Sequence, residues 1–434
     1  MKNGFGLLLK VTLVLAMPLT VALAGLPSAA AEPSAPSINA VLTTYADIAE
    51  AKYADSLSGA RKLSDAIDAL LKKPGQETLE AARKAWISAR EPYQQSEAYR
   101  FGNIIVDDWE SRVNAWPLDE GLIDYVSTEF YGNTSDNELY VANVIANTSL
   151  KIGGVDVDTS NITRELLRDK LQEAGGIESN VATGYHAIEF LLWGQDLNGT
   201  EAGAGERPAT DFDLQNCTNG NCDRRRQYLR VATDLLIEDL DWMVRQWSPT
   251  GAARKALIEA EDEKRALLSL FVGLGSLTYG ELAGERMKLG LLIHDPEEEH
   301  DCFSDNTHNS HYYNALGIRN VYFGSYRRTD GSLVSGPSAS DLVRAADPAV
   351  DKRVRAAIDA VIARMTELKA RGDTIERYDQ MIAQGNEGGN AVIQAAIDAL
   401  VAQAREFERA MAALKLEAAK FEGSDSLDNP EAVQ

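Results

Sequence analysis

Residues 350–365 read VDKRVRAAIDAVIARM, and the apolar side chains in this stretch recur at steps of three and four. That period places them on one face of an α-helix. Residues 392–414 repeat the pattern, so the two segments are expected to form a long antiparallel helix pair. Comparable stripes occur over residues 40–71 and 77–101, and a Lys-Pro-Gly turn at residues 73–75 separates them.

The remainder of the chain shows little strand alternation. Further helical blocks are expected at about residues 225–247 and 252–279, and only short runs such as Asn320 to Ser325 could pair as strands. The sequence therefore predicts an all-α protein, built from two helical-bundle domains that pack against each other. Two polar, turn-rich stretches, residues 199–223 and 295–337, are expected to be long ordered loops between helices.

The chain is expected to begin with a secretory signal over residues 1–31, because a basic start and an apolar run precede small residues typical of a cleavage site. An N-terminal helical domain over residues 32–205, a C-terminal helical domain over residues 206–425 and a polar tail over residues 426–434 should follow. No other stretch approaches the roughly 18 to 20 apolar residues that span a bilayer. We therefore expect a periplasmic or envelope-associated protein with no transmembrane segment in its mature chain.

The acidic composition limits the kinds of partner that the protein can bind. The 434 residues include 66 Asp and Glu against 43 Lys and Arg, which gives a formal net charge of −23. Such a field repels nucleic acid and anionic lipid and attracts cations. Alternatively, the acids on the helix faces simply keep the protein soluble. Nucleic acid is not an expected partner.

Cys217 and Cys222 flank a turn-forming Asn-Gly pair, and an oxidising compartment would favour a small disulfide loop between them. Zinc binding by this pair would need two more ligands nearby, and the adjacent sequence contains none. Cys302 is then left as a free cysteine.

The stretch GYHAIEFLLWG, residues 184–194, places one imidazole and one carboxylate in an apolar run of helical length. His186 and Glu189 are three residues apart, so on a helix they project from one face and can contact the same ion. A buried carboxylate is costly unless it is paired or binds a cation, so the alternative to a ligand pair is a buried His–Glu ion pair. The bare pattern H-x-x-E occurs often by chance.

A second group of polar residues recurs at helical spacing. Trp86, Arg90, Tyr93 and Glu97 are four, three and four residues apart, which would place a cation, a phenol and a carboxylate on one helix face. Pro92 is expected to kink this helix or to mark a new start. A solvated, salt-bridged face is the alternative interpretation.

Hard donors are densest in residues 295–308, which read DPEEEHDCFSDNTH. Carboxylates and imidazoles in this mixture suit a divalent or ferric cation, although a solvated acidic loop would have the same composition. Just before this block, Glu281 and Glu285 are spaced by one helical turn, and Gly280 and Gly284 would permit close helix contact. Glu285 is therefore a further candidate ligand.

Four motifs together resemble those of the imelysin family, specifically its iron-regulated protein A branch. They are GYHAIEFLLWG, the W-x-x-x-R-x-x-Y-x-x-x-E pattern of residues 86–97, RVNAWPLDEGLIDYV at residues 112–126 and EEHDCFSDNTH at residues 298–308. The resemblance runs through essentially the whole mature chain. It implies two helical-bundle domains with the G-x-H-x-x-E face near their interface, expression that responds to iron and a role in iron acquisition.

The resemblance also implies which residues form the site. The candidate metal ligands are His186, Glu189, Glu97 and Glu285. A candidate additional site comprises Arg90, His300, Asp305 and His308. The favoured metal is iron, with zinc as the alternative.

We expect an iron-binding protein that works with an envelope iron-uptake component. Family members have also been labelled metallopeptidases, so a zinc-dependent peptidase that uses the HxxE pair is one alternative. A non-catalytic ligand-binding module is another. The sequence does not show whether the chain is an enzyme.

Overall fold

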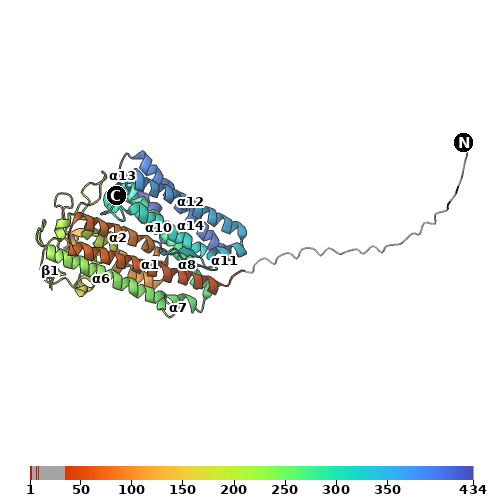
Figure 1. The fold of residues 1–434 in the computed structure, drawn as a ribbon, viewed down its shortest axis with the longest axis horizontal. Coiled ribbons are helices and arrows are strands. Elements are labelled where there is room, and N and C mark those ends of the chain that lie inside the picture. Colours follow the sequence, from red (N-terminus) through yellow and green to blue (C-terminus); the bar gives the residue numbers. More distant parts are fainter. Residues whose placement is uncertain (2–5, 7, 9–34, 434) are drawn as a thin grey trace. The chain divides into compact units, whose positions relative to one another are not determined.

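The computed structural model describes residues 1, 6, 8 and 35–433 (Figure 1). The predicted signal cleavage site, at residue 31, lies outside the described residues. The described residues from Ala35 onward form one compact unit. The compact unit is mostly α-helical with two small hairpins, which confirms the all-α class.

One group of helices surrounds α1 (Ile38–Lys72), which packs along both α2 (Gln76–Gln94) and α6 (Cys222–Trp247). Figure 1 shows these three long helices side by side. The shorter helices α3 (Ile104–Asn114) and α5 (Gly184–Trp193) fill the space against α6. The apolar stripe of α1 makes this contact, because residues such as Ile48, Leu63 and Ile67 are fully buried.

A second group of helices contains α12 and α14, the pair expected from the periodicity, and they lie side by side (Figure 1). The helix α10 packs on α12, and a long segment made of α8, η6 and α9 packs on α14. Their bounds are α8 (Glu263–Ser276), the π-helical η6 (Leu277–Lys288), α9 (Leu289–Ile293), α10 (Thr307–Phe323), α12 (Pro348–Thr374) and α14 (Glu387–Ala413).

Short elements connect these helices. They are α4 (Arg164–Leu166), α7 (Ala252–Ile258), α11 (Ala339–Ala346), α13 (Tyr378–Ile382), α15 (Asp425–Asp428), the π-helical turn η3 (Leu167–Leu171), and the 3-10 turns η1 (Glu97–Tyr99), η2 (Glu120–Leu122), η4 (Ala174–Gly176), η5 (Ala209–Phe212), η7 (Pro296–Glu298) and η8 (Pro430–Ala432). The two antiparallel hairpins are β1 (Ser149–Ile152) with β2 (Val155–Asp158) and β3 (Ser325–Arg327) with β4 (Leu333–Ser335).

The two helix groups meet where α2 packs against α10. A large apolar cluster includes residues of both groups, and a smaller one is confined to the second group, around Met365 and Leu400. Helix α6 follows the expected boundary at residue 205 in sequence but packs on α1. The division into domains at that residue stays a prediction.

The structure differs from the sequence-based expectation at α10. The expected strand at Asn320 to Ser325 was wrong, because α10 continues to Phe323 and only Ser325 joins a strand. The helix lies inside residues 295–337, which were expected to be a loop. Its buried face carries Asn314 and Ser310 in place of apolar residues, so it lacks the hydrophobic period that predicts a helix.

The predicted helix over residues 252–279 is interrupted. Asp262 starts a new helix, α8, by accepting hydrogen bonds from the backbone N–H groups of Lys264 and Arg265. The helical segment Glu263–Ile293 is long and apolar enough to cross a membrane, but 72% of its most apolar window is buried inside the protein. A core helix has the same properties, so this segment is weak evidence for a membrane span.

The start of α6 is tied to the preceding loop by a disulfide between Cys217 and Cys222, with a Cα–Cα distance of 5.9 Å. The bridge closes the turn that contains Asn219 and Gly220. Cys302 is a free cysteine.

Candidate functional site

The helix α5 is buried along its whole length and begins at Gly184. This glycine has a φ of +84°, and a Cβ atom built on it would lie 2.5 Å from the carbonyl oxygen of Val113. Only glycine combines that backbone conformation with so close an approach. The glycine of the G-x-H-x-x-E pattern therefore seats α5 against the end of α3 and fixes where the next turn projects its polar side chains.

Substituting Gly184 with alanine is expected to destabilise the fold by about 2 to 3 kcal/mol, through left-handed strain and overpacking together. The matched control is Gly175→Ala, because Gly175 has a φ of +73° and a Cβ atom added to it would meet no heavy atom within 4 Å. That variant should lose only the part of the unfolding free energy that comes from left-handed backbone strain, about 1 kcal/mol. Urea unfolding of both variants measures the two costs, and equal losses would contradict the packing argument.

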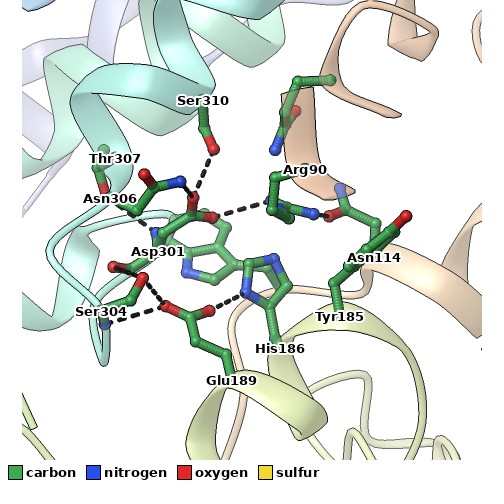
Figure 2. A network of polar contacts seen from close by, with 12 residues as sticks. Arg90, Asn114, Tyr185, His186, Glu189, Asp301, Ser304, Asn306, Thr307 and Ser310 are labelled. Carbon is green, nitrogen blue, oxygen red and sulfur yellow. Dashed lines mark hydrogen bonds and ion pairs between the residues drawn. The ribbon is translucent and has the colours of Figure 1, made fainter. Parts of the chain in front are cut away.

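His186 and Glu189 contact each other on the inner face of α5, as their spacing predicts (Figure 2). The Nδ1 atom of His186 lies 2.9 Å from Oε2 of Glu189. The other carboxylate oxygen accepts hydrogen bonds from the backbone N–H of Ser304 at 3.1 Å and from its hydroxyl at 2.6 Å. Both oxygens of Glu189 are thus engaged, whereas the buried Nε2 of His186 has no hydrogen-bond partner among the described residues.

Two further donors, His300 and Asp301, come from the segment before α10. The rings of His186 and His300 have centroids 4.8 Å apart, and the buried Nδ1 of His300 also has no partner in the described part of the chain. One donor atom each from His186, His300 and Asp301 lies within 4.8 Å of the other two. These three buried side chains are the group at this site that could hold a metal ion together.

Asp301 is held in place from three directions (Figure 2). Its Oδ1 accepts a hydrogen bond from Arg90 at 2.8 Å, and its Oδ2 accepts one from Asn306 at 2.9 Å and another from the hydroxyl of Ser310. Each carboxylate oxygen has two lone pairs, so Oδ1 keeps one for another partner. The network fixes the carboxylate without using its full acceptor capacity.

Arg90 joins this site to a second polar network. It donates a hydrogen bond to Asn114, whose amide donates to Glu97 at 2.6 Å and to Glu110 at 3.1 Å. The other oxygen of Glu97 forms a buried ion pair with Arg286. Glu97 therefore lies two hydrogen-bonding residues away from Asp301, and its charge is already paired.

The pKa directions fit neutral imidazoles beside a charged carboxylate. Burial lowers the pKa of His186 to about 3, with Arg90 adding to the effect. Burial, together with Arg286, holds the pKa of His300 well below its usual value. Burial acts to raise the pKa of Asp301, but Arg90 and the hydrogen bonds from Ser310 and Asn306 outweigh it and the pKa is lowered. Burial raises the pKa of Glu189 well above its usual value, and Asp301 adds to that.

Two cavities border the donors. His186 lines one of about 230 Å³, together with Glu120, and His300 lines another of about 340 Å³, together with Glu285. Trp116 lines both cavities, and its indole N–H donates to the carbonyl of Glu299 at 3.1 Å. Small molecules could thus approach the donor group from two sides.

A buried ion-pair network holds the loop that lines the first cavity. Asp124 accepts hydrogen bonds from Arg207 at 2.7 Å and from Arg225 at 2.6 Å. Arg207 also pairs with Asp211 at 3.0 Å. All four side chains are at most 1% exposed. The network ties the segment after η2 to the start of α6.

The structure separates several residues that the sequence grouped. Glu285 lies at the second cavity. Because η6 is π-helical, Arg286 and not Glu285 stacks over Glu281, and Nε of Arg286 lies 2.9 Å from the Glu281 carboxylate. Nε2 of His308 lies 3.2 Å from Asp373, and His308 is not a member of the His186, His300 and Asp301 group. Asp305 belongs to a different acidic cluster. Of the predicted residues, His186, Glu189, Arg90 and His300 come together.

Sequence reasoning missed Asp301, Ser304 and Ser310 as members of the site. Asp301 stands next to His300 in the EEHDCFSDNTH motif, so the motif contained the signal. The role of Ser304 depends on how the segment before α10 packs against α5, and the role of Ser310 depends on how that segment lies against the first turn of α10 (Figure 2).

A sequence profile of the imelysin family matches residues 49–407. The chain belongs to the imelysin family. Among curated proteins, this imelysin-family chain is 23% identical over 288 residues to iron-regulated protein A of Synechococcus elongatus. That alignment covers 64% of this chain and 62% of the relative, so it spans less than two thirds of the relative's length.

Solved structures of imelysin-like proteins share the fold. An iron-regulated protein A precursor from Parabacteroides distasonis aligns with a TM-score of 0.59 at 17% identity, over 88% of this chain and 97% of that one. An imelysin-like protein from Psychrobacter arcticum aligns with a TM-score of 0.55 at 16% identity, over 89% of this chain and 99% of that one. At these identities the likeness concerns the fold alone.

Proposed function

We propose that this protein binds one metal ion, with iron favoured, through His186, His300 and Asp301. The observation that carries the proposal is the pair of buried imidazole nitrogens without hydrogen-bond partners among the described residues, beside a buried carboxylate. Buried polar atoms in native proteins are rarely left unpaired. Metal coordination would satisfy both nitrogens at once.

The donor chemistry fits a transition metal. Two imidazoles and one carboxylate are a donor set that holds ferrous iron or zinc with positions left open. Glu189 is then a positioning residue, because a ligating histidine usually donates its second ring N–H to a carboxylate. The ligand candidates Glu97 and Glu285 remain predictions, since Glu97 is paired with Arg286 and Glu285 lines a neighbouring cavity.

We infer iron over other metals from the relatives. One relative is named an iron-regulated protein, and one neighbour is named the precursor of such a protein. The word iron-regulated supports an iron-related role, and the word precursor fits an exported protein. We propose that the protein acts in iron acquisition in the periplasm or cell envelope, together with an envelope iron-uptake component. When bound, iron would supply Lewis acidity, and the chain's own groups would orient it and exclude water.

The test compares metal binding by wild type, His186→Ala and the control His294→Ala. His294 lies outside the donor group, and its Nδ1 contacts the carbonyl oxygen of Ile382 at 2.6 Å. Protein without a histidine tag is stripped with a chelator and titrated anaerobically with ferrous iron, with bound metal measured by mass spectrometry. Wild type and His294→Ala should bind one ion per chain. His186→Ala should bind at least about 100-fold more weakly, because a direct ligand is lost.

Two results would overturn the proposal. One is wild-type protein that stays empty at micromolar iron, and the other is His186→Ala that binds as tightly as wild type. Circular dichroism shows whether each variant is folded, so loss of binding is not confused with loss of structure. A non-catalytic ligand-binding module would instead retain its ligand after chelation.

A zinc-dependent peptidase is the second candidate, because the same donors suit a hydrolytic zinc ion. Such an enzyme also needs a general base near the bound water, and both oxygens of Glu189 already accept or share hydrogen bonds. We therefore expect no cleavage of generic peptides by zinc-loaded protein. Chelator-sensitive cleavage that Glu189→Gln abolishes would support the peptidase instead.

A further inference from the structure

Three acidic side chains, Glu299, Asp305 and Asp379, converge outside the site described above. One carboxylate oxygen from each lies within 4.8 Å of the other two. The three residues are only 1%, 4% and 1% exposed. They come from the segment before α10 and from α13, so tertiary packing brings them together.

Most oxygens in this acidic cluster have no partner. Both oxygens of Glu299, both of Asp379 and Oδ1 of Asp305 are buried without a hydrogen bond to any described residue. None of the three carboxylates forms a salt bridge within the described chain. A buried carboxylate costs several kcal/mol or more unless it is paired or coordinates a cation. The three carboxyls therefore need either protons or a bound cation, and no salt bridge within the described chain supplies that cation.

The surroundings make the cluster more electronegative still. Asp196 adds negative charge to all three acids. Arg377 opposes this effect at Asp305, but its guanidinium donates to the carbonyl oxygen of Gly372 at 2.7 Å and forms no salt bridge with the three acids among the described residues. A cavity of about 10 Å³, lined by Glu299 and Asp379, adjoins the cluster. That volume is about what one water molecule or one ion requires.

We propose that Glu299, Asp305 and Asp379 form a second cation site, which takes a hard divalent ion, with calcium as the best fit. The three donors are carboxylates, and calcium is bound almost entirely by oxygen. Two oxygens on opposite sides of a calcium ion are roughly 4.6 to 5.2 Å apart, which follows from Ca–O distances of about 2.3 to 2.6 Å. The three oxygens lie within 4.8 Å of one another, so one calcium ion can reach all of them.

This site differs in chemistry from the His186, His300 and Asp301 group. It offers no nitrogen donor, so iron(II) or zinc has less reason to prefer it. Glu299 and His300 are neighbours in sequence but belong to different donor groups. The two donor groups share no residue, so the second site can be tested independently of the proposed function.

The experiment follows the melting temperature of the full mature chain, stripped with a chelator, as calcium chloride is added. Wild type should gain about 3 °C at a calcium concentration 100 times Kd, because an ion that binds only the folded state stabilises it. Asp379→Asn should show no gain. The control Asp398→Asn, at an exposed position of α14, should respond like wild type.

In the metal-free proteins the order of the melting temperatures should be reversed. Without calcium, Asp379→Asn should melt higher than wild type, because the amide relieves the repulsion among three buried acids at almost unchanged shape. Asp305→Asn repeats the test if circular dichroism shows that Asp379→Asn does not fold. His186→Ala should keep the calcium response even though it loses iron, which separates this proposal from the proposed function.

Two outcomes overturn the second site. The first is a wild-type melting temperature that does not change up to 10 mM calcium chloride, with the same flat response by calorimetry. The second is a calcium response that Asp379→Asn and Asp305→Asn both retain in full.

Discussion

Asp124→Asn is expected to destabilise the fold by about 3 to 5 kcal/mol, which is the cost of breaking a buried ion pair from one side. Asp124 accepts hydrogen bonds from both Arg207 and Arg225, and its carboxylate is 1% exposed. The amide keeps the shape but removes the charge. Two buried guanidinium groups would then share Asp211 as their remaining carboxylate among the described residues.

Urea unfolding at pH 7 measures this loss. The matched control is Asp234→Asn, because Asp234 pairs with Arg164 at 3.1 Å on the surface, where both side chains are partly exposed. Exposed pairs of this kind are worth about 0 to 1 kcal/mol. A loss below about 1 kcal/mol in Asp124→Asn, no larger than that of an exposed pair, would mean that Asp211 alone balances both arginines.

The contribution of Asp124 should also depend on pH. Burial acts to raise the pKa of Asp124, but Arg207 and Arg225 outweigh it and lower the pKa. A carboxyl with a lowered folded-state pKa stabilises the protein fully above its unfolded pKa and loses that contribution as pH falls through the folded pKa. The difference between wild type and Asp124→Asn should therefore shrink below about pH 4.

Glu120→Gln should have the opposite dependence on pH. Burial raises the pKa of Glu120 from 4.5 to about 8, and Glu297 adds to the effect. The folded state thus favours the protonated carboxyl, so stability is lost as pH rises from the unfolded toward the folded pKa. Between pH 5 and pH 8 the unfolding free energy of wild type should fall by as much as about 4 kcal/mol relative to that of Glu120→Gln, at about 1.4 kcal/mol per pH unit.

Unfolding free energies of both proteins at pH 5, 6.5 and 8 test this expectation. The glutamine can still accept the hydrogen bond that Gln195 donates to Glu120 at 2.7 Å, so packing is preserved. Glu129→Gln, at an exposed turn, is the control for the removal of one carboxylate. Parallel pH profiles for wild type and Glu120→Gln would show that the carboxylate stays ionised when folded.

The parts of the fold that the sequence predicts are those with an apolar face. The pair α12 and α14 was predicted because Val354, Ile358 and Val361 recur at helical spacing and are buried in the structure. The turn between α1 and α2 was predicted because proline and glycine mark it.

The elements that the sequence does not predict have polar buried faces or irregular backbones. Helix α10 buries Asn314, which hydrogen-bonds to Gln94, so no apolar period reveals it. Helix α2 ends at Gln94, and Glu97 lies in the 3-10 turn that follows. The π-helical turns of η6 change which side chains stack, and residue spacing alone does not report such a change.

The candidate site was predicted only in its local part. The contact between His186 and Glu189 follows from a spacing of three on a helix. The proximity of Asp301 depends on how two distant segments pack, and a single sequence contains no measure of that distance.

The segment from Glu299 to Asn306 supplies side chains to both proposed ion sites. Glu299 and Asp305 belong to the acidic cluster, whereas His300 and Asp301 belong to the site that includes His186. If each group holds its ion and this shared backbone couples them, the factor by which calcium changes the iron affinity must equal the factor by which iron changes the calcium affinity.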